Sequence, residues 1–211
     1  MATAGRTLTI IQSATDTMRD LRIQVLTQQT LVGAENNINF SNRWQEGYIA
    51  VGRWHEGDDH GETRIYYGKA EVTIDGSSDI VKGLTVEFSN DRDVIGTGDW
   101  SKSQWEANGP QCISGYMHHG DENHSFQLHV VDVALKVDRT GEYLPISVVK
   151  RGDVYQRKDS TQHFFSAYQY HCLWTKFWRD WNGDENDGTT YGESEFLIRN
   201  VNLTELGAEI E

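Results

Sequence analysis

The sequence has little of what marks several common protein classes. Its 211 residues include only two cysteines and two prolines, and no apolar run reaches the length of a transmembrane helix. Two cysteines do not make a disulfide framework, so we expect Cys112 and Cys172 to be buried thiols. The N-terminal sequence MATAGRTLTI has no basic segment followed by an apolar core. It therefore predicts no signal peptide, and a protein that stays in the cytoplasm or is released without one.

Basic residues are outnumbered as well. The chain has 19 lysines and arginines against 32 acidic residues, which gives a formal net charge of −13. Nucleic-acid phosphates and anionic membrane surfaces both bind through lysine and arginine, so this balance predicts no nucleic-acid partner. The acidic surplus itself favours solubility.

The common catalytic motifs are also missing. The sequence contains no G-x-S-x-G, P-loop or H-E-x-x-H motif, and no G-x-G-x-x-G after a strand. Neighbouring carboxylates such as Asp58 and Asp59 are poorly suited to glycoside hydrolysis, which needs two carboxyl groups facing each other across a cleft. We therefore expect no catalytic residues, with an enzyme that uses carboxylates from different strands as an alternative.

A short acidic turn occurs three times at a spacing of 63 residues. It reads GDDH at 57–60 and GDEN at 120–123 and 183–186. The same shift lays residues 14–33 on 77–96, and residues 144–159 follow at a shift of 60, which also relates Cys112 to Cys172. Self-similarity at a fixed period is the mark of internal repeats. The sequence thus predicts three repeats of about 60 residues, at approximately 7–69, 70–132 and 133–202.

Each repeat has the pattern of a strand series. Apolar and polar residues alternate over 21–25 and again over 84–88, the period of two that is typical of a half-buried strand. A second strand is expected around Leu31, a third over 47–55 and a fourth after the acidic turn. The only helix candidate is residues 14–21. Short apolar segments separated by Gly, Asn, Asp and Ser indicate an all-β fold.

We therefore predict one all-β domain over residues 1–211, with pseudo-threefold symmetry of the trefoil or prism kind. A propeller assembled from two chains is the alternative. Residues 1–6 and 206–211 are expected to be loose ends. The strand that follows the acidic turn occurs once in each repeat, the last time as FLIRNV (196–201). TLTII (7–11) resembles a fourth copy, although a closed threefold ring uses only three. We expect one of these two segments to pair with the other or, by strand addition, with a second protomer, so that the protein is a homo-oligomer.

Aromatic and imidazole rings flank the acidic turns. A sugar presents hydroxyl groups that bind carboxylates and amides, and an apolar face that stacks on an aromatic ring. The pattern predicts a lectin-like protein that binds glycans or glycoconjugates at up to three shallow sites. Its candidate ligand-binding residues are Trp54, Asp58, Asp59, His60, Tyr116, His118, Asp121, Glu122, Asn123, Trp178, Trp181, Asp184, Glu185 and Asn186. Rings after the turns are Tyr66, Phe126 and Tyr191. The alternative is that these rings belong to the core, because strands favour aromatic residues.

Metal binding gives two further hypotheses. Asp184, Glu185 and Asp187 offer carboxylates for an isolated calcium ion, although no EF-hand frame surrounds them. His118 and His129 are candidates for a single zinc site if they face each other across two strands. Because the third repeat has Trp181 where the second has His118, a zinc site in every repeat is excluded. No other cofactor is expected.

A membrane-acting or lipid-binding β-rich toxin is the main rival to the lectin. Tryptophan and tyrosine gather where proteins meet the membrane interface, and the chain has seven tryptophans.

Overall fold

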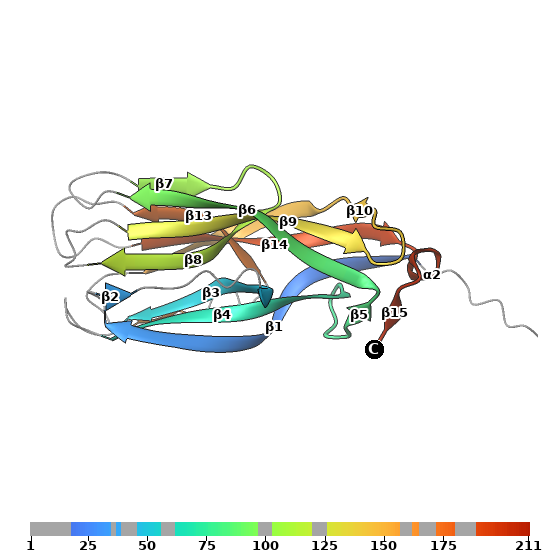
Figure 1. Cartoon of the computed structure of the whole chain (residues 1–211), viewed down its shortest axis with the longest axis horizontal. Coiled ribbons are helices and arrows are strands. Elements are labelled where there is room, and N and C mark those ends of the chain that lie inside the picture. The colour runs from blue at the N-terminus through green and yellow to red at the C-terminus, as the bar shows by residue number, and fades with distance from the viewer. Residues whose placement is uncertain are drawn as a thin grey trace, which may run out of the picture.

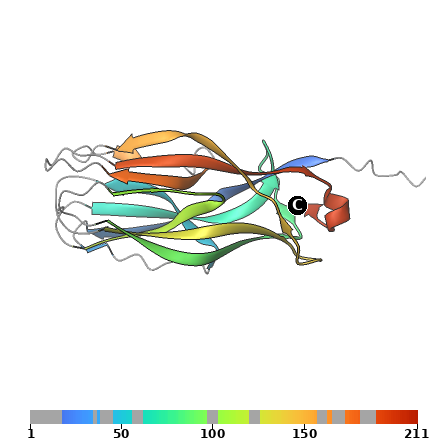
Figure 2. The same ribbon diagram turned by 90° about the horizontal axis from the view of Figure 1, so that it is seen from above.

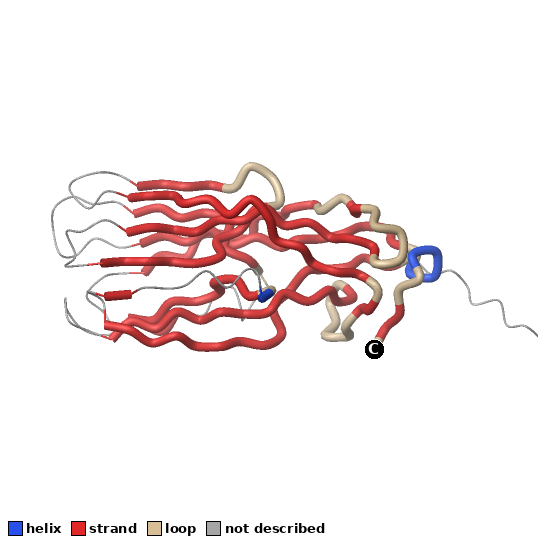
Figure 3. The backbone as a smooth tube through the Cα atoms, in the orientation of Figure 1, coloured by secondary structure: helices blue, strands red, loops and turns tan. Residues whose placement is uncertain are grey.

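The computed structural model describes residues 18–34, 37–38, 46–55, 62–96, 103–119, 126–156, 162–164, 172–179 and 189–211. Within these residues the chain forms fifteen strands and one helix of four residues, α2 (Leu203–Leu206). Figure 3 shows that strands make up almost the whole body. The prediction of an all-β fold is confirmed.

The long strands form three units with one strand order. Unit one consists of β1 (Arg19–Ala34), β3 (Tyr48–His55) and β4 (Glu62–Ile74). Unit two consists of β6 (Leu84–Gly96), β8 (Gln111–His119) and β9 (Phe126–Val137). Unit three consists of β11 (Ser147–Gln156), β13 (Leu173–Arg179) and β14 (Thr189–Val201). In every unit the last strand lies between the other two and is antiparallel to both.

Each unit receives a fourth strand from another unit. The short strand β2 (Asn37–Ile38) follows β1 and pairs with β8 of unit two. In the same way β7 (Ser103–Glu106) follows β6 and pairs with β13 of unit three, and β12 (Gln162–Phe164) follows β11 and pairs with β3 of unit one. The exchange runs from unit one to two, from two to three, and from three back to one. All three units are thereby connected in a closed cycle.

The units are also connected through their long strands. The pairing of β1 with β14 joins units one and three in an eight-stranded sheet, while unit two and β10 (Tyr143–Leu144) form a five-stranded sheet. A third, two-stranded sheet pairs β5 (Val81–Lys82) with β15 (Glu209–Ile210). The strands of all three units run along the long axis of the molecule (Figures 1 and 2). These sheets do not by themselves establish a trefoil or a prism, which remain predictions.

A β-bulge interrupts the same pairing in each unit. The register shifts between Ala50 and Gly52 in β3, between Ile113 and Gly115 in β8, and between Trp174 and Lys176 in β13. The residues opposite are 66–67, 129–130 and 192–193, so each bulge lies 63 residues after the previous one along the central strands. A bulge bends its strand and increases the local twist. The three units therefore bend at equivalent places.

The register corrects the alignment of the two cysteines. Cys112 lies opposite Val131, and the residue opposite Ser194, 63 positions later, is Leu173. Cys172 is thus one residue away from the place equivalent to Cys112. Both thiols are free and buried, as predicted. Burial raises the pKa of Cys172 to about 12 and that of Cys112 further still, so both remain protonated at neutral pH.

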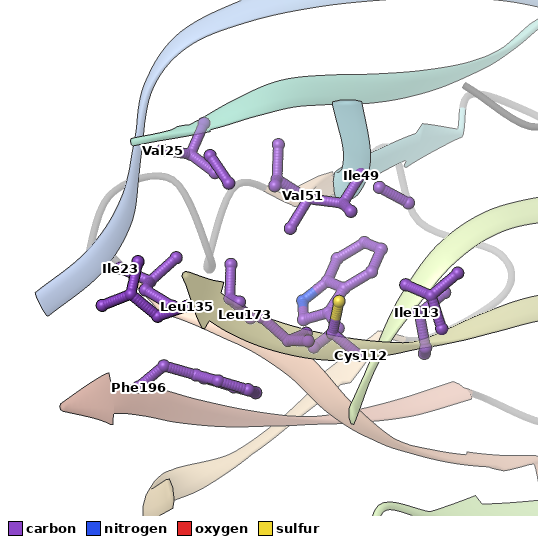
Figure 4. Close-up of a cluster of buried hydrophobic side chains, with 14 of the residues drawn as sticks. Ile23, Val25, Ile49, Val51, Cys112, Ile113, Leu135, Leu173 and Phe196 are labelled. Carbon is purple, nitrogen blue, oxygen red and sulfur yellow. The ribbon is translucent and has the colours of Figure 1, made fainter. Parts of the chain in front are cut away.

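The core lies between the sheets and follows the predicted alternation. Leu21, Ile23 and Val25 of β1 are fully buried, and Phe196 of β14 lies opposite Ile23. Figure 4 shows side chains from strands of all three units pointing toward one another, with Leu135 among them. Burying a side chain of this size contributes about 1.5–3 kcal/mol, which makes this cluster the main source of stability.

Two local predictions about β1 were wrong. The expected first and second strands of each repeat are one long strand, since β1 runs without a break through both segments. The predicted helix over 14–21 is not formed at its described end, where Arg19, Asp20 and Leu21 belong to β1. Residues 14–17 lie outside the described residues.

The C-terminal residues are ordered rather than loose. The side chain of Asn202 accepts a hydrogen bond from the Glu205 N–H at the start of α2, and Gly207 ends the helix in the left-handed conformation. Ala208 is buried, and Glu209 and Ile210 pair with β5.

At Phe196 and Leu197 the strand FLIRNV has no free edge for a second protomer. Phe196 and Leu197 of β14 pair with β1 on one edge and with β11 on the other. Both edges are thus occupied within the chain at this point. The alternative segment, TLTII at 7–11, lies outside the described residues, so association through it stays a prediction. Among the helical residues described, no segment has the length and apolar character needed to cross a membrane.

Candidate functional site

The three acidic turns connect paired strands at one end of the molecule. Residues 56–61 join β3 to β4, 120–125 join β8 to β9, and 180–188 join β13 to β14. The last pairs before these turns are His55 with Thr63, His118 with Phe126, and Arg179 with Thr189. In Figure 1 these strand ends lie together, opposite the end that carries α2 and the C-terminus.

Only part of the predicted site lies within the described residues. Trp54, Tyr116, His118 and Trp178 belong to β3, β8 and β13, close to the turns, and their backbone alone is described. The remaining candidates, Asp58, Asp59, His60, Asp121, Glu122, Asn123, Trp181, Asp184, Glu185 and Asn186, lie outside the described residues.

The strand register shows which of these positions are equivalent. Trp54 lies opposite Arg64 and Trp178 opposite Thr190, which are 126 residues apart, twice the repeat length. The two tryptophans therefore have the same place in units one and three. By the same criterion His118 corresponds to His55 and Arg179, so its predicted correspondence with Trp181 is wrong.

Two of the rings expected beside the turns belong to the core instead. Tyr66 and Tyr191 are only 7% and 2% exposed. Tyr191 stacks on Trp174 with ring centroids 4.3 Å apart and meets Phe177 edge to face at 5.5 Å. Such aromatic pairs stabilise a fold and are closed to a ligand. The side chain of Phe126 lies outside what is described.

The structure contradicts the proposed pairing of histidines. His118 lies opposite Phe126, and His129 lies opposite Gly115, so the two do not face each other. His129 Nδ1 is instead 2.8 Å from Asp93 Oδ1. No cluster of three or more His, Cys, Asp or Glu suited to a metal ion occurs within the described ranges. Asp184, Glu185 and Asp187 lie outside them, so a calcium ion at the third turn stays a prediction; the turn joins two strands, unlike an EF-hand loop.

A polar cleft of about 370 Å³ opens on unit three. Lys176 and Gly192 face each other in this cleft, three residues from the strand ends Arg179 and Thr189. Three residues of strand span roughly 10 Å. The cleft is lined by Glu106, Lys150, Arg151, Gly152, Asp153, Thr175, Lys176, Gly192, Glu193 and Ser194.

Donors and acceptors alternate along the cleft. Lys176 Nζ is 2.5 Å from Asp153 Oδ2, and Lys150 forms an ion pair with Glu106. The hydrogen bond from Lys150 lowers the pKa of Glu106, which therefore stays ionised. Solvent-exposed ion pairs add little to the free energy of unfolding, so a polar ligand can readily replace one partner of such a pair.

An ion-pair network around the buried Glu195 carboxylate holds Arg151, which lines the cleft. Glu195 of β14 is 5% exposed and accepts from Arg22 Nη1 at 2.8 Å and from Arg151 Nη2 at 2.5 Å. Arg22 also binds Asp75 at 2.6 Å. Because Arg22 lies in β1 and Arg151 in β11, the network ties units one and three to the strand that carries the cleft.

Gly192 is the position where the cleft tolerates least change. A Cβ atom there would lie 2.5 Å from Lys176 Cβ and 3.0 Å from Asp153 Oδ1. We expect Gly192→Ala to lower the free energy of unfolding by about 1–3 kcal/mol, because the strands must move apart. Gly152→Ala is the matched control in the same cleft, since its Cβ would meet nothing within 4 Å. Equal losses in urea unfolding for both variants would contradict this account.

Sequence reasoning missed the cleft. Glu106, Lys150 and Lys176 lie on three different strands and share no motif. They meet only through the pairing of β7 with β13 and of β11 with β14.

No family model matches the chain. No curated protein and no solved structure matches it either. Arguments about function therefore rest on this chain's own residues.

Proposed function

We propose that the protein is a carbohydrate-binding, lectin-like protein with up to three pseudo-equivalent sites at the acidic turns. One observation carries the proposal: the three hairpins that bear these turns end together, on units linked by a cyclic exchange of strands. Equivalent sites on one rigid body gain avidity when the target presents several sugars.

The strand pairing supports a pseudo-threefold prism as the architecture of these units. Each unit is a group of four paired strands in the same order, which one chain supplies completely. A propeller would need a second chain, since known propellers start at about four blades. We prefer the prism to the trefoil because the four strands of each unit lie side by side.

The chemistry of the turn-bearing end suits a sugar. Asp, Glu and Asn at the turns supply acceptors and amide donors for hydroxyl groups. The cleft on unit three adds lysine and carboxylate groups roughly 10 Å from its turn. The equivalent positions of Trp54 and Trp178 place an aromatic residue next to two of the turns.

Alanine substitution of Asp58, Asp121 and Asp184 tests the proposal. We expect each single variant to bind weakly on a glycan array and the triple variant to lose binding. Substitutions in connecting turns usually change the free energy of unfolding by no more than about 0.5 kcal/mol, so the triple variant should stay folded. The control is Asp79→Ala, an exposed residue in a turn between β4 and β5. A triple variant that unfolds would show that the turns are structural.

Two additions separate the alternatives. EDTA abolishes binding on the array if calcium at the third turn takes part, and leaves it unchanged otherwise. A liposome-leakage assay tests the membrane-acting toxin. Leakage without any glycan signal would replace the lectin proposal.

A further inference from the structure

A second cavity lies on unit two, away from the acidic turns. Its volume is about 500 Å³, and it is lined by Gly47, Val86, Glu87, Phe88, Ser89, Ala134 and Tyr143. Tyr143 of β10 is 60% exposed. The other aromatic residues whose side chains are described are buried or half-buried. An exposed aromatic ring at the mouth of a cavity is therefore unusual for this chain.

A carboxylate shared with a lysine fixes the Tyr143 ring. Its hydroxyl donates to Glu87 Oε2 at 2.8 Å, and Lys136 Nζ donates to Glu87 Oε1 at 2.7 Å. The hydrogen bond from Lys136, followed by that from Tyr143, lowers the pKa of Glu87, so the carboxylate stays ionised. Glu87 lies on β6, Lys136 on β9 and Tyr143 on β10. Three strands thus hold one aromatic platform in a single orientation.

The triad keeps unused hydrogen-bonding capacity. A carboxylate has about four lone-pair positions, of which Glu87 uses two within the described residues. An ammonium group has three donors, and Lys136 uses one of them there. Ala134 lies opposite Glu87 and therefore shares its face of the sheet, where it adds a small apolar contact to the cavity. The cavity therefore offers a ring to stack on, free acceptors and a small apolar contact, and Lys136 beside Glu87 adds free donors.

We propose that this cavity binds one pyranose ring, stacked on Tyr143 with its hydroxyl groups bonded to Glu87 and Lys136. The site is distinct from the acidic turns. Lys136, which pairs with Tyr143, lies ten residues along β9 from Phe126, where the second turn ends. Ten residues of strand span roughly 33 Å. The inference therefore stands whether or not the turns bind sugars.

The Tyr143 platform belongs to unit two, although Gly47 beside β3 also lines the cavity. In unit two, β10 pairs with the end of the central strand β9. In unit three, β1 occupies the equivalent position and pairs with the end of β14. A tyrosine on a short added strand is thus a local feature, and we expect one such site per chain.

Saturation-transfer NMR with methyl glycosides of glucose, galactose, mannose and N-acetylglucosamine tests the proposal on the full chain. We expect at least one of them to bind with a Kd on the order of 1 mM, as suits one shallow contact. Tyr143→Ala should raise that Kd at least tenfold, since aromatic anchors dominate binding sites. Tyr143→Phe keeps the ring and should change the Kd less than Tyr143→Leu, which keeps only apolar bulk.

The triple variant at Asp58, Asp121 and Asp184 distinguishes this site from the turns. We expect it to keep the glycoside signal that Tyr143→Ala loses. A signal lost in the triple variant but kept in Tyr143→Ala would overturn the Tyr143 site, and so would the absence of any signal from the wild type at about 10 mM glycoside. Because Tyr143 is exposed, circular dichroism should show all three of its variants to be folded.

Discussion

Replacing Glu195 by alanine is expected to lower the free energy of unfolding by about 3 kcal/mol. The carboxylate is buried and binds Arg22 and Arg151 at once. Its removal leaves the guanidinium group of Arg22, whose side chain is only 14% exposed, with Asp75 as its remaining partner in the network described here. Removing one partner of a buried ion pair commonly costs about 3–5 kcal/mol, and the bond to Asp75 places this case at the lower end. Guanidinium chloride unfolding measures the loss.

Glu106→Ala is the matched control for Glu195→Ala. Glu106 binds one lysine, Lys150, and both side chains are largely exposed to water. Solvent screens such a pair, so the midpoint of unfolding should hardly change. Equal shifts for the two variants would show that the buried network has no special weight.

Replacing Trp174 by alanine is expected to cost about 3–5 kcal/mol of stability. The side chain is 2% exposed and stacks on Tyr191, so its loss removes both apolar burial and an aromatic contact. Trp174→Phe keeps a ring against Tyr191 and should lose much less. Circular dichroism during guanidinium unfolding is the appropriate measurement, because removal of a tryptophan alters the fluorescence signal itself.

Trp105→Ala serves as the comparison for Trp174→Ala. Trp105 lies opposite Phe177 on the short strand β7 and is only partly buried. Because the space left by the Trp105 side chain opens to water, the loss of stability should be smaller than for Trp174→Ala. If Trp105→Ala lost more stability than Trp174→Ala, the packing that matters most would lie at the exchanged strand β7 and not inside unit three.

The fold class could be predicted because its signals are local. Alternation at Leu21, Ile23 and Val25 marks a strand with one face in the core, and all three are buried. The acidic turns mark the points where paired strands reverse. The capping residues of α2, Asn202 and Gly207, bracket four helical residues, but the sequence was expected to be loose from residue 206 on, so this helix was missed. The helix is so short that the apolar pattern around it gave no helical period.

The cross-unit pairings could not be predicted, because they depend on register rather than on pattern. A shift of one residue leaves the apolar pattern nearly unchanged, and only the pairing shows that Leu173 and not Cys172 corresponds to Cys112. Strands as short as β2 carry too few residues for a period. The cleft and the Tyr143 cavity join residues that are far apart in the sequence, such as Glu87 and Tyr143.

The cyclic exchange of strands has a consequence for synthesis on the ribosome. β12 completes unit one by pairing Gln162 with His55, more than one hundred residues earlier in the chain. At about 5–20 residues per second, the edge of β3 waits several seconds for its partner. During that time it presents unpaired backbone groups to other nascent chains. Unit one, the first to be started, is therefore finished only after unit two is complete, and its waiting edge is a point at which a chaperone would protect the growing protein.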